Sequence, residues 1–82
     1  MRQLHISVLR IVADNRDITF VEIKERLEVG GVTITRDAVL VDCLLDLEQD
    51  HKFVKRAKAR VNGIPCQIYW LTNEGKQYLT TQ

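Results

Sequence analysis

The sequence predicts an α+β fold in which three helices precede a two-stranded β-hairpin and a short last helix. Apolar residues recur at helical spacing over roughly the first fifty residues. Two runs rich in β-branched and aromatic residues then flank Asn62-Gly63, the dipeptide most typical of a tight hairpin turn. At 82 residues there is room for one small core. We therefore expect a single domain over residues 1–82.

The first predicted helix covers residues 3–13 and ends near Asp14. Its apolar residues have helical spacing: Leu4, Val8, Ile11 and Val12, with Ile6 and Leu9 widening the stripe. The second helix begins at Phe20, because Thr19 and Glu22 have the spacing of a capping box. It ends at Gly30-Gly31, because consecutive glycines are unfavourable inside a helix.

The third helix follows a short extended link and runs to about Asp50. Either Thr33 or Thr35 is expected to cap it, and Asp37 favours its positive N-terminus. One face holds apolar residues, namely Leu40, Cys43, Leu44 and Leu47, extended by Ala38, Val41 and Leu45. The remaining stripe is expected to face solvent: Val39, Asp42, Asp46, Gln49 and Asp50. This pattern predicts a helix buried over more than half of its circumference.

The hairpin covers residues 53–71, and its register follows if Asn62 and Gly63 form the loop. Val61 then pairs with Ile64, and Val54 pairs with Leu71. One face carries Val54, Tyr69 and Leu71 near the base, with Arg56, Lys58 and Arg60 toward the tip. The other face carries Ala57, Ala59, Cys66, Ile68 and Trp70. Thr72 is a plausible N-cap for a last helix over residues 73–79.

Charge is divided unevenly along a chain whose net charge is only +1. Residues 35–50 carry five acidic residues against Arg36 alone. Residues 51–61 carry five basic residues and no acidic one: Lys52, Lys55, Arg56, Lys58 and Arg60. An acidic helix is thus followed directly by a basic strand, which is the main functional clue in the sequence.

Several classes of function find no support in the sequence. Cys43, Cys66, His5 and His51 lack metal-site spacing, so we expect small core cysteines and surface or capping histidines. No nucleophile motif or phosphate-binding glycine loop occurs, so we expect neither an enzyme nor a cofactor. The residues show no signal-peptide pattern, no apolar run of membrane-spanning length and no evident small-molecule site, so we expect a cytoplasmic protein.

Three motifs in this order resemble winged helix-turn-helix domains over nearly the whole chain. LRIVADNRDITFVEIKERL is similar to the passage between the first two helices of small MarR-like, ArsR-like and PadR-like transcriptional regulators. LLDLEQDHKFVKR resembles the end of their recognition helix entering the wing, and YWLTNEG matches their recurrent Tyr-x-Leu-Thr-x-x-Gly. The resemblance implies a regulator that contacts duplex DNA with helix 3 and a basic wing. The residues it implies are Arg36, Val39, Gln49, Lys55, Arg56, Lys58 and Arg60.

The exposed face of helix 3 departs from that pattern, because it presents aspartates where such regulators usually present polar or basic residues. A carboxylate repels phosphates and accepts mainly from cytosine in direct readout. The alternative function is therefore a protein interaction module, in which acidic helix 3 or the wing binds a second copy or another protein. Few residues follow Gly75, so we expect any dimer to use the surfaces of this domain. The candidate interface comprises Ala57, Ala59, Ile68 and Trp70. The alternative for Ile68 and Trp70 is a core position under a twisted wing, which is the commoner outcome for a lone Trp in a small domain.

Overall fold

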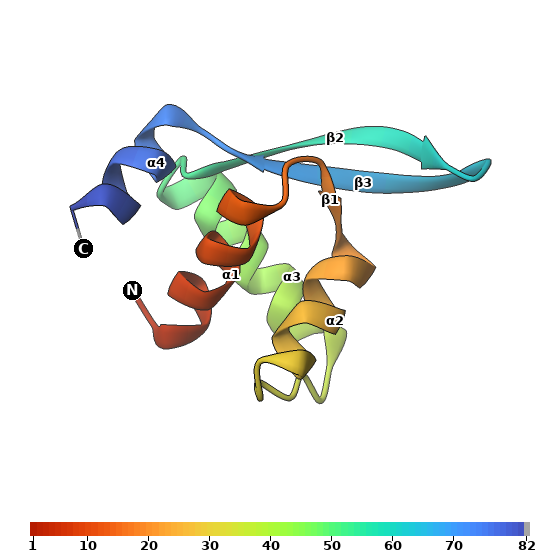
Figure 1. Cartoon of the computed structure of the whole chain (residues 1–82), viewed down its shortest axis with the longest axis horizontal. Coiled ribbons are helices and arrows are strands. Elements are labelled where there is room, and N and C mark those ends of the chain that lie inside the picture. Colours follow the sequence, from red (N-terminus) through yellow and green to blue (C-terminus); the bar gives the residue numbers. More distant parts are fainter. Residues whose placement is uncertain (82) are drawn as a thin grey trace.

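The computed structural model describes residues 1–81 and has the predicted order of helices and hairpin, with one additional short strand (Figure 1). The helical elements are α1 (Gln3–Asp14), α2 (Phe20–Val29), α3 (Asp37–Leu45), the π-helical turn η1 (Asp46–Asp50) and α4 (Asn73–Thr80). The strands are β1 (Ile18–Thr19), β2 (Val54–Val61) and β3 (Ile64–Leu71). The α+β fold class is thus confirmed.

Helix α2 begins and ends where the sequence predicts. The backbone N–H of Glu22 donates to Thr19 Oγ1 at 3.2 Å, and the Glu22 carboxylate accepts from the Thr19 N–H, which completes the capping box. At the other end the N–H groups of Gly31 and Val32 donate to the carbonyls of Glu28 and Leu27. Gly31 has φ +89°, which only glycine adopts readily, so this pair of bonds forms a Schellman motif.

Helix α3 starts at Asp37, one residue later than a Thr35 cap would require and three residues later than a Thr33 cap would require. Its N-cap is Arg36, which makes no side-chain capping bond, and the prediction of Thr33 or Thr35 as cap is wrong. The Asp37 carboxylate at the first helical position instead accepts from Lys24 Nζ of α2 at 2.8 Å. The helix continues to Asp50 as predicted, but its last turn is π-helical, since the His51 N–H donates to the Asp46 carbonyl five residues earlier.

The hairpin has the predicted register in full, from Val54 opposite Leu71 to Val61 opposite Ile64. Asn62 and Gly63 both have positive φ, as a type I′ turn requires. The two-stranded hairpin is confirmed, and the structure adds a third strand that the sequence does not predict, because Ile18 and Thr19 of β1 pair with Tyr69 and Ile68. Strand β3 is therefore central, and the sheet is tied to the chain immediately before α2.

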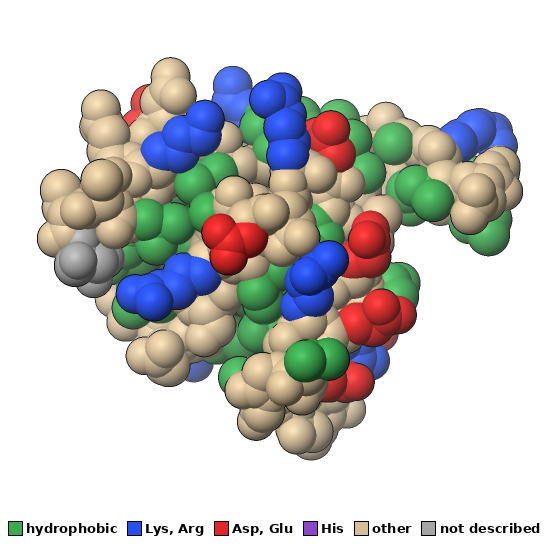
Figure 2. Space-filling model, in the orientation of Figure 1, with side chains coloured by type: hydrophobic (Ala, Val, Ile, Leu, Met, Phe, Trp, Pro, Cys, Tyr) green, Lys and Arg blue, Asp and Glu red, His purple; other side chains and the backbone are tan. Residues whose placement is uncertain are grey.

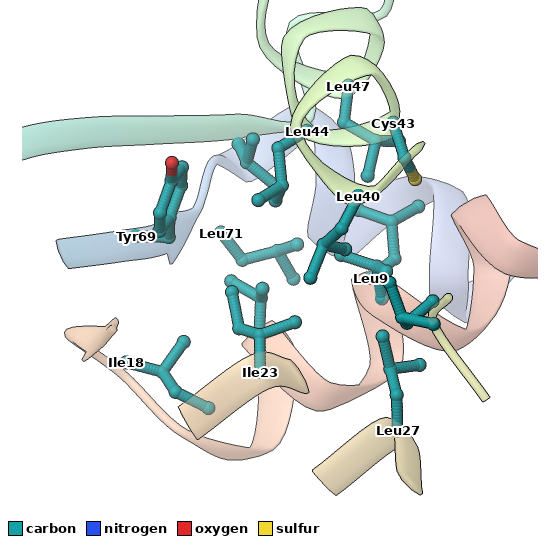
Figure 3. Close-up of a cluster of buried hydrophobic side chains, with 14 residues drawn as sticks. Leu9, Ile18, Ile23, Leu27, Leu40, Cys43, Leu44, Leu47, Tyr69 and Leu71 are labelled. Atoms are coloured by element: carbon teal, nitrogen blue, oxygen red, sulfur yellow. The ribbon is translucent and has the colours of Figure 1, made fainter. Parts of the chain in front are cut away.

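The core lies where α1, α2 and α3 meet the base of the hairpin. Figure 3 shows Leu40, Leu44 and Leu47 directed toward side chains from the other two helices and from β3. Fourteen buried apolar residues make up this cluster: Val8, Leu9, Val12, Ile18, Ile23, Leu27, Ile34, Leu40, Cys43, Leu44, Leu47, Val54, Tyr69 and Leu71. Burying each large side chain contributes roughly 1.5–3 kcal/mol of transfer free energy.

Two predictions about burial are wrong. Ala38 and Val41 do not extend the core face of α3, because both are exposed, with Val41 at 42%. The stripe of α3 in the core is thus narrower than half of its circumference. His5 is not a surface residue: it lies on the inner side of α1 at 9% exposure, and its Nε2 is 3.3 Å from Asp46 Oδ2.

Helix α4 fastens the base of the hairpin. The Thr72 hydroxyl accepts from the Gly75 N–H, as predicted for the N-cap, and donates to the Lys52 carbonyl at 2.7 Å. Gly75 is buried, and a Cβ there would meet the carbonyl oxygen of Phe53 and the Leu71 side chain. None of the helices in residues 1–81 is long and apolar enough to cross a membrane.

Candidate nucleic-acid interface

The outer part of the hairpin forms a wing that projects beyond the helices (Figure 1). Figure 2 shows Lys or Arg side chains beside hydrophobic ones at the free end of the wing. Lys58 and Arg60 lie on this outer part, on the strand face that continues the core-facing residues Val54 and Tyr69. Lys55 projects from the opposite face, because side chains alternate along a strand. The predicted basic residues therefore lie on two sides of the wing.

Arg56 is engaged within the protein. Its Nε donates to Glu48 Oε2 at 3.0 Å, and its Nη1 donates to Gln67 Oε1 at 3.1 Å. The Tyr69 hydroxyl also donates to Gln67 Oε1, at 3.4 Å. Burial raises the pKa of Tyr69, and the Arg56 charge acts in the opposite direction. These contacts fix the inner part of the wing against η1, and they leave Arg56 less free than Lys58.

Arg60 remains exposed near the turn. Its Nη1 donates to the Gly63 carbonyl at 3.1 Å, which holds the guanidinium across the end of the hairpin. Among residues 1–81, Lys55, Lys58 and Arg60 form no ion pair with an acidic side chain. Three positive charges on the wing are thus available to a ligand.

The predicted contact residues of α3 do not face the wing. Val39 and Gln49 line a recess of about 630 Å³ on the α1 side of the helix, together with Arg2, His5 and Asp46. Arg36 is exposed at the N-terminal end of α3. Lys55, Lys58 and Arg60 thus share the wing, whereas Val39 and Gln49 lie on the α1 side of α3.

A groove of about 590 Å³ lies between the wing and the two helices α2 and α3, and we refer to it as the wing–helix groove. Its lining is Thr19, Phe20, Val21, Asp37, Val41, Leu44, Leu45, Glu48, Arg56, Cys66, Gln67 and Tyr69. Val21 and Val41 are 61% and 42% exposed, so apolar side chains face solvent along one wall. The sequence does not predict this groove, because the helical spacing of apolar residues assigns Val41 to the core. The signal that could have found it is the placement of Val21 opposite the core face of α2.

The second face of the wing carries the predicted interface residues. Ala57 is exposed, whereas Ala59, Ile68 and Trp70 are half-buried. Trp70 also lines a small recess with Val12 of α1 and other residues from α1 and α4. Its ring is thus partly covered within the domain.

The two cysteines are free and lie in different environments. Cys43 is buried, and burial together with the nearby Asp46 charge raises the pKa of its thiol to about 12. Cys66 is half-buried on the wing. Within residues 1–81, no group of three or more histidine, cysteine or acidic side chains has an arrangement that could hold a metal ion.

Known structures share this architecture. No protein-family model and no curated protein sequence matches the chain. A PadR-like transcription factor from Bacteroides fragilis superposes with a TM-score of 0.80 at 18% identity, over 95% of this chain and 74% of that one. A PadR-like transcriptional regulator from Bacillus cereus gives 0.81 at 19% identity, over 95% and 75%. Bacillus subtilis PadR, solved in complex with operator DNA, gives 0.79 at 18% identity, over 98% of this chain and 46% of PadR.

The helices, the wing and these similarities define a winged helix-turn-helix domain. Among proteins of that class, its fold resembles the PadR-like regulators, as the sequence motifs predict. The chain spans less than half of Bacillus subtilis PadR.

Proposed function

We propose that this protein is a small DNA-binding transcriptional regulator in which the wing supplies most of the contacts with the duplex. The observation that carries the proposal is the position of Lys58 and Arg60, exposed on the outer part of the wing and free of acidic partners within residues 1–81. Such side chains bind phosphates without reading sequence. The fold shared with a protein solved on operator DNA supports the proposal.

The predicted residues take different roles in this proposal. Lys55, Lys58 and Arg60 bind phosphates, and Arg36 adds a positive charge at the start of α3. Arg56 orients the wing, because Glu48 and Gln67 hold its guanidinium. Val39 and Gln49 contact base edges where the exposed side of α3 enters the major groove. In this role the chain acts as one domain over residues 1–82, in the cytoplasm, without enzymatic activity or a cofactor.

The proposal is tested by titrating a fluorescent duplex of random sequence with the protein at several salt concentrations. Three phosphates neutralised by the wing give a slope of about −3 in log K against log salt, since each contributes roughly −0.9. Replacing Lys58 and Arg60 by Ala is expected to weaken binding to every sequence. The slope should become shallower by about 1.8, because two phosphate contacts are lost.

The matched control removes two positive charges from the helices, with Arg10→Ala in α1 and Lys76→Ala in α4, both exposed. This variant is expected to keep the slope of the wild type. Failure of the folded wild type to bind any duplex at low salt would overturn the proposal.

A further inference from the structure

The exposed side of α3 lies between two hollows of the surface. The wing–helix groove follows one flank of the helix, and the recess of about 630 Å³ follows the other flank, beside α1. Leu45 lines both hollows, so it lies near the middle of this side. At about 100° per residue, Ala38 and Asp42 lie on the same side as Leu45, opposite the buried Leu40. These residues therefore point away from the core, between the wing and α1.

The side chains that α3 exposes include no hydrogen-bond donor. The exposed or half-buried residues of the helix are Asp37, Ala38, Val39, Val41, Asp42 and Leu45. Aliphatic side chains offer only apolar groups, and an ionised carboxylate only accepts hydrogen bonds. Guanine presents two acceptors in the major groove, and it is read by donors such as Arg or Lys. The exposed side of α3 therefore has no group that can bind the major-groove edge of guanine.

Ala38 and Val41 form an apolar surface on this side. They are three positions apart, which makes them neighbours on a helix. Both are exposed, with Val41 at 42%. In the major groove, apolar side chains of this kind contact the C5-methyl group that thymine presents. The chemistry of this surface thus matches thymine.

Asp42 is the aspartate of α3 whose carboxylate is available to a ligand. The Asp37 carboxylate pairs with Lys24 Nζ, whereas Asp42 is exposed and forms no ion pair within residues 1–81. A carboxylate in the major groove accepts a hydrogen bond from the N4 amino group of cytosine. The free acceptor of this side therefore matches the second pyrimidine.

We propose that α3 reads pyrimidines, with Ala38 and Val41 on thymine methyl groups and Asp42 on the amino group of cytosine. The proposal rests on the proposed function, because it specifies the bases that the helix recognises once the wing has bound phosphates. Ala38 and Asp42 are about 6 Å apart along the helix axis, which corresponds to roughly two base-pair steps. The recognised thymine and cytosine therefore lie close together in the duplex. Asp42 weakens binding to all sequences by repelling phosphates, and it selects cytosine in return.

The test begins with a library of duplexes that have a random central segment. The folded wild type is mixed with the library at low salt, and the bound duplexes are separated and sequenced. They are expected to be enriched in thymine and cytosine within about three base pairs of one another, given the length of the exposed side.

The most enriched duplex is then made with deoxyuridine in place of thymidine, which removes only the C5-methyl groups. Anisotropy titration of the wild type is expected to give a dissociation constant about fourfold higher for each contacted methyl group, corresponding to roughly 0.8 kcal/mol. Val41→Ser is expected to lose most of the difference between the two duplexes, because Val41 supplies most of the apolar surface.

Asp42→Asn tests the polar contact. An asparagine amide binds adenine through two hydrogen bonds, so the preferred base at this position is expected to change from cytosine to adenine. Binding to unselected duplexes should become tighter at the same time, because one negative charge is removed. The matched controls change the same residue types outside α3, with Val29→Ser at 90% exposure in α2 and Asp14→Asn at the end of α1. Both are expected to keep the base preferences of the wild type, and circular dichroism confirms that each variant is folded.

The possible outcomes separate this inference from the proposed function. Binding of duplexes without enrichment of any sequence overturns the inference and leaves the proposed function standing. The inference is also overturned if the wild type binds both duplexes equally, or if Asp42→Asn selects the same bases as the wild type. Failure of the wild type to bind any duplex at low salt overturns both.

Discussion

In this domain, the contacts that a side chain makes depend on its position in the fold as well as on its residue type. Arg56 and Lys58 are two positions apart on one face of β2, yet only Arg56 reaches η1 and pairs with Glu48. The sequence places both on the same face through strand alternation. It does not place η1 beneath Arg56, because that contact depends on how the helix crosses the sheet.

Cys43 and Cys66 illustrate the same point for reactivity. Cys43 is 3% exposed, and its thiol pKa is raised to about 12 from 9.0. The folded state therefore keeps a proton that the unfolded chain loses between these values. The contribution of the neutral thiol to the free energy of unfolding is fully present below pH 9.0, and it is lost as the pH rises toward 12. At neutral pH the Cys43 thiol is both covered and protonated.

We expect a thiol reagent at neutral pH to modify Cys66 in the folded protein and Cys43 only after unfolding. The thiolate is the reactive form, and burial denies the reagent access to Cys43. Absorbance of the released chromophore should show one fast thiol per chain, and a second thiol after urea is added. The Cys66→Ser variant should show no fast thiol. Equal rates at both positions would contradict the burial of Cys43.

At the scale of elements, the sequence predicts the features that depend on neighbouring residues. The capping box at Thr19, the Schellman stop at Gly31 and the hairpin register all follow from local chemistry. Strand β1 escaped prediction because two residues give no periodicity, and its partner Tyr69 lies about fifty positions away. The burial of His5 escaped for a related reason, since its neighbour Asp46 belongs to another helix.

The contact between η1 and β2 can be tested by releasing Arg56. Glu48→Gln removes the carboxylate that accepts from Arg56 Nε. Under the proposed function, duplex DNA should bind more tightly, and the salt slope should steepen by about 0.9 because one more phosphate is neutralised. Anisotropy titration at several salt concentrations measures both. Since the pair is partly exposed, unfolding free energy should change by less than about 1 kcal/mol.

The control for this change is Glu74→Gln, which removes one exposed carboxylate from α4. It should leave the salt slope unchanged. If both variants alter binding equally, net charge and not the release of Arg56 explains the effect.

At the scale of the whole molecule, the division of charge follows directly from the sequence, whereas the wing–helix groove does not. The groove combines residues from α2, α3 and β3, and its shape depends on packing between them. Helical periodicity assigns Val41 to the core because it cannot tell a buried flank of a helix from the wall of an open groove. The candidate site is thus predictable in its charge and not in its form.

The exposed aspartates of the third helix test whether this helix approaches DNA under the proposed function. Replacing Asp42 and Asp50 by Asn removes two negative charges that form no ion pair within residues 1–81. Duplex binding should become tighter, because repulsion of phosphates falls. Anisotropy titration measures the change. Asp14→Asn combined with Glu74→Gln, outside α3, is the charge-matched control, and equal binding by all of these variants would exclude a role for the acidic helix.

The π-helical turn at Asp46–Asp50 sets the direction in which the wing points. Its hydrogen bond spans five residues where an α-helix spans four, so this turn holds one residue more than a regular one. The hydrogen bond from Thr72 and the close packing at Gly75 fix the base of the wing, whereas its outer part projects beyond the helices. Removing one residue from the turn would rotate the point of attachment by about 100°, the angle between successive helical residues. The direction of the wing therefore depends on the length of the helix that precedes it, several residues before β2 begins.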